Sequence, residues 1–284
     1  MGWHATQVRV PSRDGVELAV HDLGGDGPPL LIVHATGLLA QAYTPLAAEL
    51  APSFHVWGVD VRAHGGSTRP ADGNLEWSGM AADVLAAVDA IGGEQPYGFG
   101  HSMGGASVVL AEVARPGTFR SMYLYEPVLF PAGSLPSGPD GNPLASGARK
   151  RRPSFASRDE AYANYAAKPP LNEMSPASLR AYVDHGFVDQ ADGTVTLACR
   201  PEDEAETFVG AASAGAFERL GEVRCPAVVS RGSLESMGPA SLAPAQAEAF
   251  PDGRLVILDG LAHFGPLADE RAVAASIVGE LLGS

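Results

Sequence analysis

Short apolar runs alternate along this chain with amphipathic stretches whose apolar residues recur at helical spacing. The apolar runs predict strands at residues 16–24, 29–35, 54–60, 97–100, 121–126, 225–232 and 253–260, the first of them antiparallel. The amphipathic stretches predict helices at residues 42–50, 77–92, 104–114, 241–250 and 268–282. Strand–helix alternation of this kind predicts an α/β fold, with a mostly parallel central sheet flanked by helices.

The alternation stops after Glu126. This residue ends the sixth predicted strand, because one further strand is expected near the N-terminus before residue 16. A stretch rich in Pro, Gly and Ser follows, and then helical segments without strands, near residues 158–167 and 176–185. We therefore expect a core domain of residues 1–126 plus 222–284, and a helical lid inserted at residues 127–221. The aromatic residues of this lid either line an apolar pocket or pack the lid onto the sheet; they are Phe130, Phe155, Tyr162, Tyr165, Tyr182 and Phe187.

Charge and composition narrow the classes of partner. The net charge of −14 argues against nucleic acid and anionic membranes as partners, and no apolar run is long enough to span a membrane.

The two cysteines, Cys199 and Cys225, do not form a disulfide framework or a zinc-site pattern, so a reducing cytoplasm is expected. The basic run Arg149–Arg152 is expected to be a solvated turn. Lysines number only two among the 19 basic residues, which favours a bacterium with a GC-rich genome.

A serine lies between glycines at Gly100-His101-Ser102-Met103-Gly104, after a predicted strand and before a predicted helix. This is the G-x-S-x-G pattern in the context that a nucleophile requires. The glycines leave room for a sharp turn that exposes the serine hydroxyl at the start of a helix. There the N–H of Met103 and the helix dipole favour the negative charge of a tetrahedral intermediate.

A serine hydroxyl is a poor nucleophile without a base. His263 follows the last predicted strand, at the edge of the sheet where Ser102 is expected, and no other histidine occupies such a position. The sequence therefore predicts His263 as the general base.

The segments IVHATG, DVRAHGGS, GHSMGG and LAHFGP together resemble the α/β-hydrolase superfamily, in its serine-nucleophile branch, over nearly the whole chain. The resemblance implies that the N–H of Thr36 completes an oxyanion hole with that of Met103, although Ala35 replaces the usual glycine beside it. It also implies that His34 supports this loop. Asp60, Arg62 and His64 match a scaffold loop of the family, in which Ala63 replaces a glycine.

The acid that orients the histidine has two candidates, because the family places it after either of two strands. Glu126 closes the strand before the insertion, and a buried carboxylate there needs a partner. Glu235 lies near the family's more common position after the next strand. The sequence favours Glu126 and leaves both open.

These residues predict a serine hydrolase that works through an acyl-enzyme, without a metal or cofactor, on carboxylic esters of small apolar molecules. A serine in place of an aspartate argues against a haloalkane dehalogenase or an epoxide hydrolase of this fold. A thioesterase, a C–C bond hydrolase, a lactonase or perhydrolase, and a natural-product cyclase remain as alternatives. A ligand-binding protein without catalysis is the hypothesis from another class.

Overall fold

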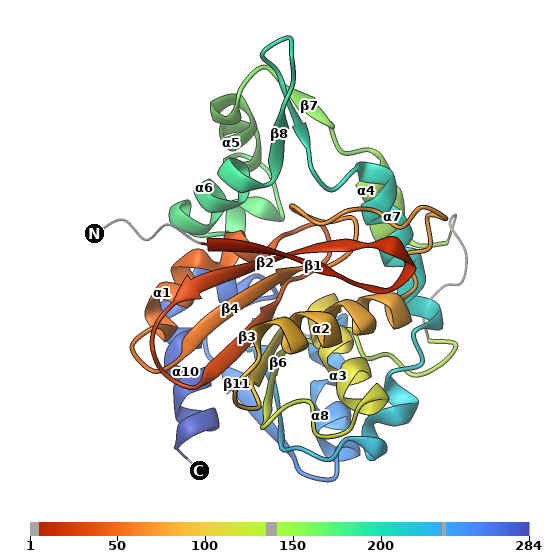
Figure 1. Ribbon diagram of the computed structural model, residues 1–284, viewed down its shortest axis with the longest axis vertical. Helices are drawn as coiled ribbons and strands as arrows, with labels where there is room; N and C mark the ends of the chain where they lie inside the picture. The colour runs from red at the N-terminus through yellow and green to blue at the C-terminus, as the bar shows by residue number, and fades with distance from the viewer. Residues whose placement is uncertain (1–5, 135–140, 235–236, 284) are drawn as a thin grey trace.

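The computed structural model describes residues 6–134, 141–234 and 237–283 (Figure 1). Within these residues the main sheet has eight strands in the order β1-β2-β4-β3-β5-β6-β10-β11. Their bounds are β1 (Thr6–Pro11), β2 (Glu17–Gly24), β3 (Pro29–Val33), β4 (His55–Asp60), β5 (Tyr97–His101), β6 (Met122–Tyr125), β10 (Ala227–Gly232) and β11 (Gly253–Leu258). The β1–β2 and β2–β4 pairs are antiparallel and the other pairs are parallel, which confirms the predicted fold class.

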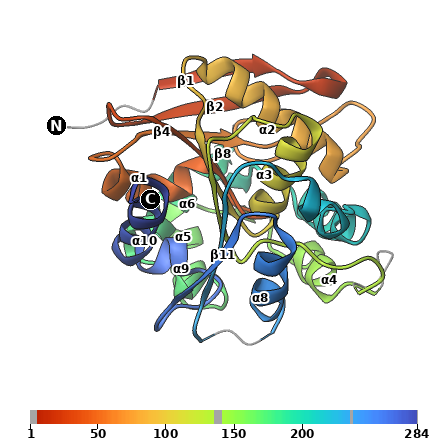
Figure 2. The ribbon, with the colours of Figure 1, turned by 90° about the horizontal axis from the view of Figure 1, so that it is seen from below.

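Two helical layers cover the sheet. Successive side chains of a strand point to opposite faces, so Leu30 and Ile32 of β3 join one apolar core while Leu31 and Val33 join the other. Figure 2 shows α1 and α10 on one side of the sheet and α2, α3 and α8 on the other. The helices are α1 (Thr44–Leu50), α2 (Trp77–Ile91), α3 (Met103–Ala114), α8 (Pro239–Ala249), α9 (Gly265–Ala268) and α10 (Glu270–Leu282).

The register of the parallel strands brings three loops together at one edge of the sheet. His101 at the end of β5 pairs with Tyr125 of β6, and Tyr125 pairs in turn with Ser230 of β10. The residues that follow β5 and β6 are Ser102 and Glu126, so both enter the loop region beside each other. This placement agrees with the rule that sites of parallel sheets form at the carboxyl ends of the strands.

A long segment lies between β6, the sixth strand, and β10, and Figure 1 shows its α5, α6 and β8 above the sheet. It contains α4 (Pro143–Arg149), β7 (Ser154–Phe155), α5 (Arg158–Ala166), α6 (Pro176–His185), β8 (Phe187–Asp189), β9 (Val195–Leu197) and α7 (Pro201–Gly210). Beyond the expected helices, β7, β9 and β8 form a small antiparallel sheet that the sequence did not predict. The indole N–H of Trp77 donates to the Thr207 carbonyl over 3.0 Å and joins this segment to the core.

Four of the aromatic residues in this segment pack against one another. The ring centroid of Phe155 lies 5.7 Å from that of Tyr165 and 5.8 Å from that of Phe187. The ring centroids of Tyr165 and Tyr182 lie 5.9 Å apart. All four side chains are buried. The sequence left open whether these residues pack or line a pocket. For these four residues the structure favours packing.

Among the helices of the described residues, none combines the length and the apolar character that a membrane span requires.

Candidate active site

Ser102 lies at the sharp turn between β5 and α3. Its backbone has φ 56° and ψ −118°, a conformation that side-chain-bearing residues rarely adopt. The chain passes very close to itself here, because a Cβ on Gly104 would lie 2.1 Å from the Val33 carbonyl oxygen. A Cβ on Gly100 would lie 2.5 Å from the Cα of Gly105. Glycine at both positions is therefore a steric requirement of the turn.

Two backbone N–H groups lie near this turn on separate elements. Met103 is the first residue of α3, and Thr36 follows β3. Within the described part of the chain, neither N–H donates to a protein acceptor. The N–H of Gly37 donates to Nε2 of His64 over 3.1 Å, and Nδ1–H of His64 donates to the Arg62 carbonyl over 3.0 Å. His64 thus holds the loop that carries Thr36.

The His263 ring contacts a buried carboxylate. Its Nδ1 lies 2.7 Å from Oε2 of Glu126, whose other oxygen accepts the N–H of Gly232 over 3.0 Å. Glu126 is fully buried and has φ 41°, and its own N–H donates to the Ser230 carbonyl over 2.8 Å. The carboxylate therefore has a fixed position from which it accepts Nδ1–H and leaves Nε2 of His263 free to accept a proton.

The structure brings Ser102, His263 and Glu126 to the same edge of the sheet. No hydrogen bond between described residues joins the Ser102 hydroxyl to the His263 ring, a contact that often tightens only when substrate is bound. The other predicted acid, Glu235, lies outside the described residues.

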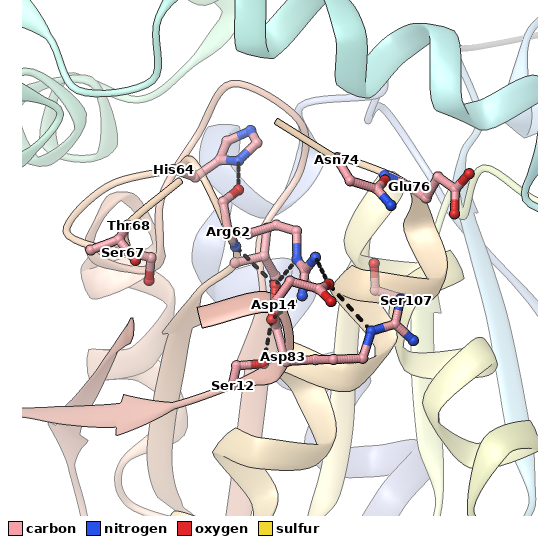
Figure 3. Close-up of polar contacts among 12 residues, drawn as sticks. Ser12, Asp14, Arg62, His64, Ser67, Thr68, Asn74, Glu76, Asp83 and Ser107 are labelled. Atoms are coloured by element: carbon pink, nitrogen blue, oxygen red, sulfur yellow. Dashed lines mark hydrogen bonds and ion pairs between the residues drawn. The ribbon is translucent and has the colours of Figure 1, made fainter. Parts of the chain in front are cut away.

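The residues assigned to the scaffold by resemblance make buried structural contacts. The Nε of Arg62 donates to Asp83 over 2.9 Å, both side chains being fully buried, and Nη1 of Arg62 reaches Asp14, also over 2.9 Å (Figure 3). Asp60 accepts the N–H of Ala40 over 2.7 Å. These contacts fix the loop from Asp60 to His64, which includes Arg62, under the site.

His34 is fully buried and keeps an uncharged ring. Its Nδ1–H donates to the Ala35 carbonyl over 2.9 Å, and its Nε2 accepts the N–H of Val61 over 3.2 Å. Burial, followed by repulsion from His64, lowers the pKa of His34 to about 4. A neutral ring that satisfies two backbone groups is a support for the loop, as the resemblance implies.

A second polar cluster lies against the Thr36 loop from the inserted segment. Arg151 forms an ion pair with Glu204 and donates to the Tyr182 hydroxyl over 2.6 Å. A Cβ on Gly37 would lie 2.5 Å from Glu204 Oε1 and 3.3 Å from Arg151 Nη1. The solvated turn expected for Arg149–Arg152 is thus wrong at Arg151, whose side chain is only 18% exposed.

Tyr43 and His101 are further residues beside the site that the sequence did not single out. The Tyr43 hydroxyl lies 2.7 Å from Nδ1 of His101, which is the residue before Ser102. The position of His101 within the G-x-S-x-G motif was an available signal, whereas no local pattern marked Tyr43.

No group of three or more His, Cys, Asp or Glu residues in the described ranges has an arrangement that could hold a metal ion. The polar groups of the site are instead a hydroxyl, an imidazole, a carboxylate and backbone N–H donors. That set of groups can perform nucleophilic acyl transfer.

A family model described as "Alpha/beta hydrolase family" matches residues 30–276. The chain belongs to the alpha/beta hydrolase family. This hydrolase is 26% identical over 252 residues to RutD of Azorhizobium caulinodans, named as a carbamate hydrolase, with 86% of this chain and 87% of RutD covered. It is also 32% identical to epoxide hydrolase A of Mycobacterium tuberculosis, over only 103 residues, which are 35% of this chain and 32% of that protein.

Among solved structures, the hydrolase resembles E-2-(acetamidomethylene)succinate hydrolase with a TM-score of 0.81 and 20% identity. The match covers 99% of this chain and 100% of the other. At this identity the likeness supports the fold alone. The relatives are named as hydrolases of different bonds, so the family leaves the bond that this chain cleaves to be argued from the site.

Proposed function

We propose that this chain is a serine hydrolase in which Ser102 is the nucleophile, His263 the general base and Glu126 the orienting acid. The observation that carries the proposal is the 2.7 Å contact between His263 Nδ1 and the buried Glu126 carboxylate, beside the turn that holds Ser102. The free N–H groups of Thr36 and Met103 would form the oxyanion hole.

The reaction would proceed in two halves. Ser102 Oγ attacks the carbonyl carbon while Nε2 of His263 takes the hydroxyl proton, and the carbonyl oxygen becomes an oxyanion held by the two N–H groups. Collapse of this intermediate breaks the bond to the leaving group, which departs with the proton from His263. Water then attacks the acyl-enzyme, His263 takes a proton from it, and the released Ser102 oxygen receives that proton. Glu126 stays ionised and stabilises the charged ring throughout.

We propose carboxylic esters of small apolar molecules as substrates and residues 127–221 as a lid over a core of residues 1–126 and 222–284. The approach of Arg151 and Glu204 to Gly37 supports a small, enclosed site. A carbamate is the second candidate, because the RutD relative covers most of both chains. Attack by a serine on a carbamate carbonyl uses the same groups.

Hydrolysis of short p-nitrophenyl esters by the purified protein tests this proposal, with an aryl carbamate run beside them. We expect Ser102→Ala to abolish turnover, and Glu126→Gln to lower kcat by about 10³- to 10⁴-fold because the ring loses its orienting charge. Ser107→Ala is the matched control on the same helix, since the Ser107 hydroxyl donates to the Met103 carbonyl and makes no contact with His263.

Glu235→Gln separates the two acids. Retained activity in Glu235→Gln with loss in Glu126→Gln is the expected result, and the reverse pattern would assign the acid to Glu235. Labelling of Ser102 by a fluorophosphonate without ester turnover would indicate a narrower substrate. Absence of both turnover and labelling would contradict the proposal and favour a ligand-binding protein.

A further inference from the structure

A continuous chain of hydrogen bonds joins the Thr36 loop to the His263 loop through the nucleophile strand. The Ala35 N–H lies 3.1 Å from the Tyr43 hydroxyl, and this hydroxyl lies 2.7 Å from Nδ1 of His101. At the other side of the ring, Nε2 of His101 lies 2.9 Å from the His263 carbonyl oxygen. Tyr43 and His101 are fully buried.

The chemistry of the two ends sets the direction of every bond in this chain. A backbone N–H can only donate, so Ala35 donates to Tyr43, and a carbonyl can only accept, so Nε2–H of His101 donates to His263. A neutral ring then has an acceptor at Nδ1, which takes the Tyr43 proton. Burial, followed by repulsion from His263, lowers the pKa of His101 well below its usual value, so the ring stays neutral as this pattern requires.

Each of the three joined segments carries one part of the proposed machinery. Ala35 precedes Thr36, His101 precedes Ser102, and the third bond ends on the backbone of His263 itself. The neighbouring Ala262 carbonyl accepts the Tyr125 hydroxyl over 2.7 Å, so the His263 loop is held at two consecutive carbonyls. A shift of either loop would change the distance between the attacking oxygen, the base and the oxyanion hole.

We propose that Tyr43 and His101 are positioning residues that fix the oxyanion loop and the His263 backbone relative to Ser102. This inference rests on the proposed function and extends it to two residues that do not touch substrate. Their effect is on the geometry of the transition state, so their loss should lower kcat and leave KM nearly unchanged.

The test compares two buried tyrosines, each with a hydrogen-bonded hydroxyl. Tyr123 is also fully buried, and its hydroxyl lies 2.7 Å from Ser276 Oγ on α10 and also bonds to the Ser230 side chain on β10, so it lies outside the chain of bonds that joins Ala35, His101 and His263. We expect Tyr43→Phe to lower kcat for a p-nitrophenyl ester by about 10- to 100-fold with KM within about twofold. Tyr123→Phe should keep kcat within about twofold of the parent. The melting temperatures of the two variants should fall by similar amounts.

A second pair of variants at His101 tests the same inference if Tyr43→Phe fails to fold. His101→Leu removes both bonds and should lower kcat at least as much as Tyr43→Phe. His101→Gln places an amide oxygen toward Tyr43 and an amide N–H toward the His263 carbonyl, so it should recover part of the loss.

Two results would overturn the inference. One is equal kcat in Tyr43→Phe and Tyr123→Phe, and the other is no difference between His101→Leu and His101→Gln. Neither result would overturn the proposed function, because the parent would still hydrolyse esters and Ser102→Ala would still abolish this activity. A parent that neither turns over ester nor labels with fluorophosphonate would instead overturn the proposed function, and this inference with it.

Discussion

At the scale of single residues, backbone strain is concentrated at the proposed site. Four non-glycine residues in the described ranges have positive φ, and two of them are Ser102 and Glu126. A third is Ala63, where the family resemblance has a glycine. Such conformations cost on the order of 1–3 kcal/mol each and persist only where surrounding contacts hold them. At Ser102 these contacts include the bond from its N–H to the Tyr125 carbonyl over 3.0 Å.

Ser102→Gly should therefore be more stable than Ser102→Ala, although both lack the nucleophile. Alanine keeps the strain at φ 56°, whereas glycine removes it at a smaller cost in chain entropy, so we expect glycine to be favoured by about 1 kcal/mol. Thermal unfolding should show a melting temperature about 2–4 °C higher for the glycine variant. The matched pair is Ser107→Gly and Ser107→Ala inside α3, where helical backbone should make glycine the less stable by about 1 kcal/mol. The same order at both positions would contradict a strained Ser102.

The sequence predicted single residues where a local motif carries their chemistry. Ser102 could be singled out from the glycines around it, and His263 from its place after the last strand. Glu126 could only be ranked against Glu235, because the partner of a histidine is set by strand register and not by neighbouring residues. Tyr43 left no local signal, since one of its contacts is with a backbone N–H and the other is with His101, which lies 58 residues away in the sequence.

At the scale of elements, prediction succeeded where a strand is buried on both faces. The central parallel strands read as continuous apolar runs, and their bounds follow those runs closely. The strands β7, β8 and β9 have only two or three residues each, which is too short for a period to appear. Arg151 was misread for a related reason: its partner Glu204 lies 53 residues away on α7.

The Arg151–Glu204 pair should contribute more to stability than the exposed pair beside it. Removing the charge of Glu204 leaves a largely buried guanidinium without its ion partner, so Glu204→Gln should cost about 2–4 kcal/mol in the free energy of unfolding. Glu202 on the same helix pairs with Arg149 and is 63% exposed, so Glu202→Gln should cost much less than Glu204→Gln. Urea unfolding of both variants measures the difference. Equal costs would mean that the Arg151 pair is effectively solvated.

At the scale of the whole molecule, buried histidines underlie the site and link its loops. His34, His64 and His101 are fully buried, and burial is the first cause that lowers the pKa of each. Each ring donates a hydrogen bond from one nitrogen and accepts one at the other, which only a neutral ring can do. At His64, Nε2 accepts the N–H of Gly37 and Nδ1–H donates to the Arg62 carbonyl. Protonation of any of them would therefore break contacts in the loops around Ser102.

This arrangement predicts that the protein loses stability as the pH falls below about 6.5. An unfolded histidine takes up a proton near pH 6.5, whereas His34 in the folded chain does so only at about 4. Between these values the unfolded state binds more protons, so stability rises with pH and is lost on acidification. For His34 the loss approaches about 3.5 kcal/mol, because its pKa falls from about 6.5 to about 4 and each pKa unit corresponds to about 1.4 kcal/mol.

Urea unfolding between pH 7 and pH 5 measures the effect in a range where ordinary carboxylates stay ionised. All three histidines should make stability rise with pH in this range, and His34 alone should contribute up to about 1.4 kcal/mol per pH unit near pH 5.5. His34→Gln should be less stable than the parent at pH 7 but should have a shallower slope, because one proton uptake is removed. An unchanged slope in this variant, or a parent whose stability does not vary over this range, would mean that the buried rings accept protons without unfolding the loops. The same titration, followed by ester turnover, would then show whether acid first disables the site or the whole fold.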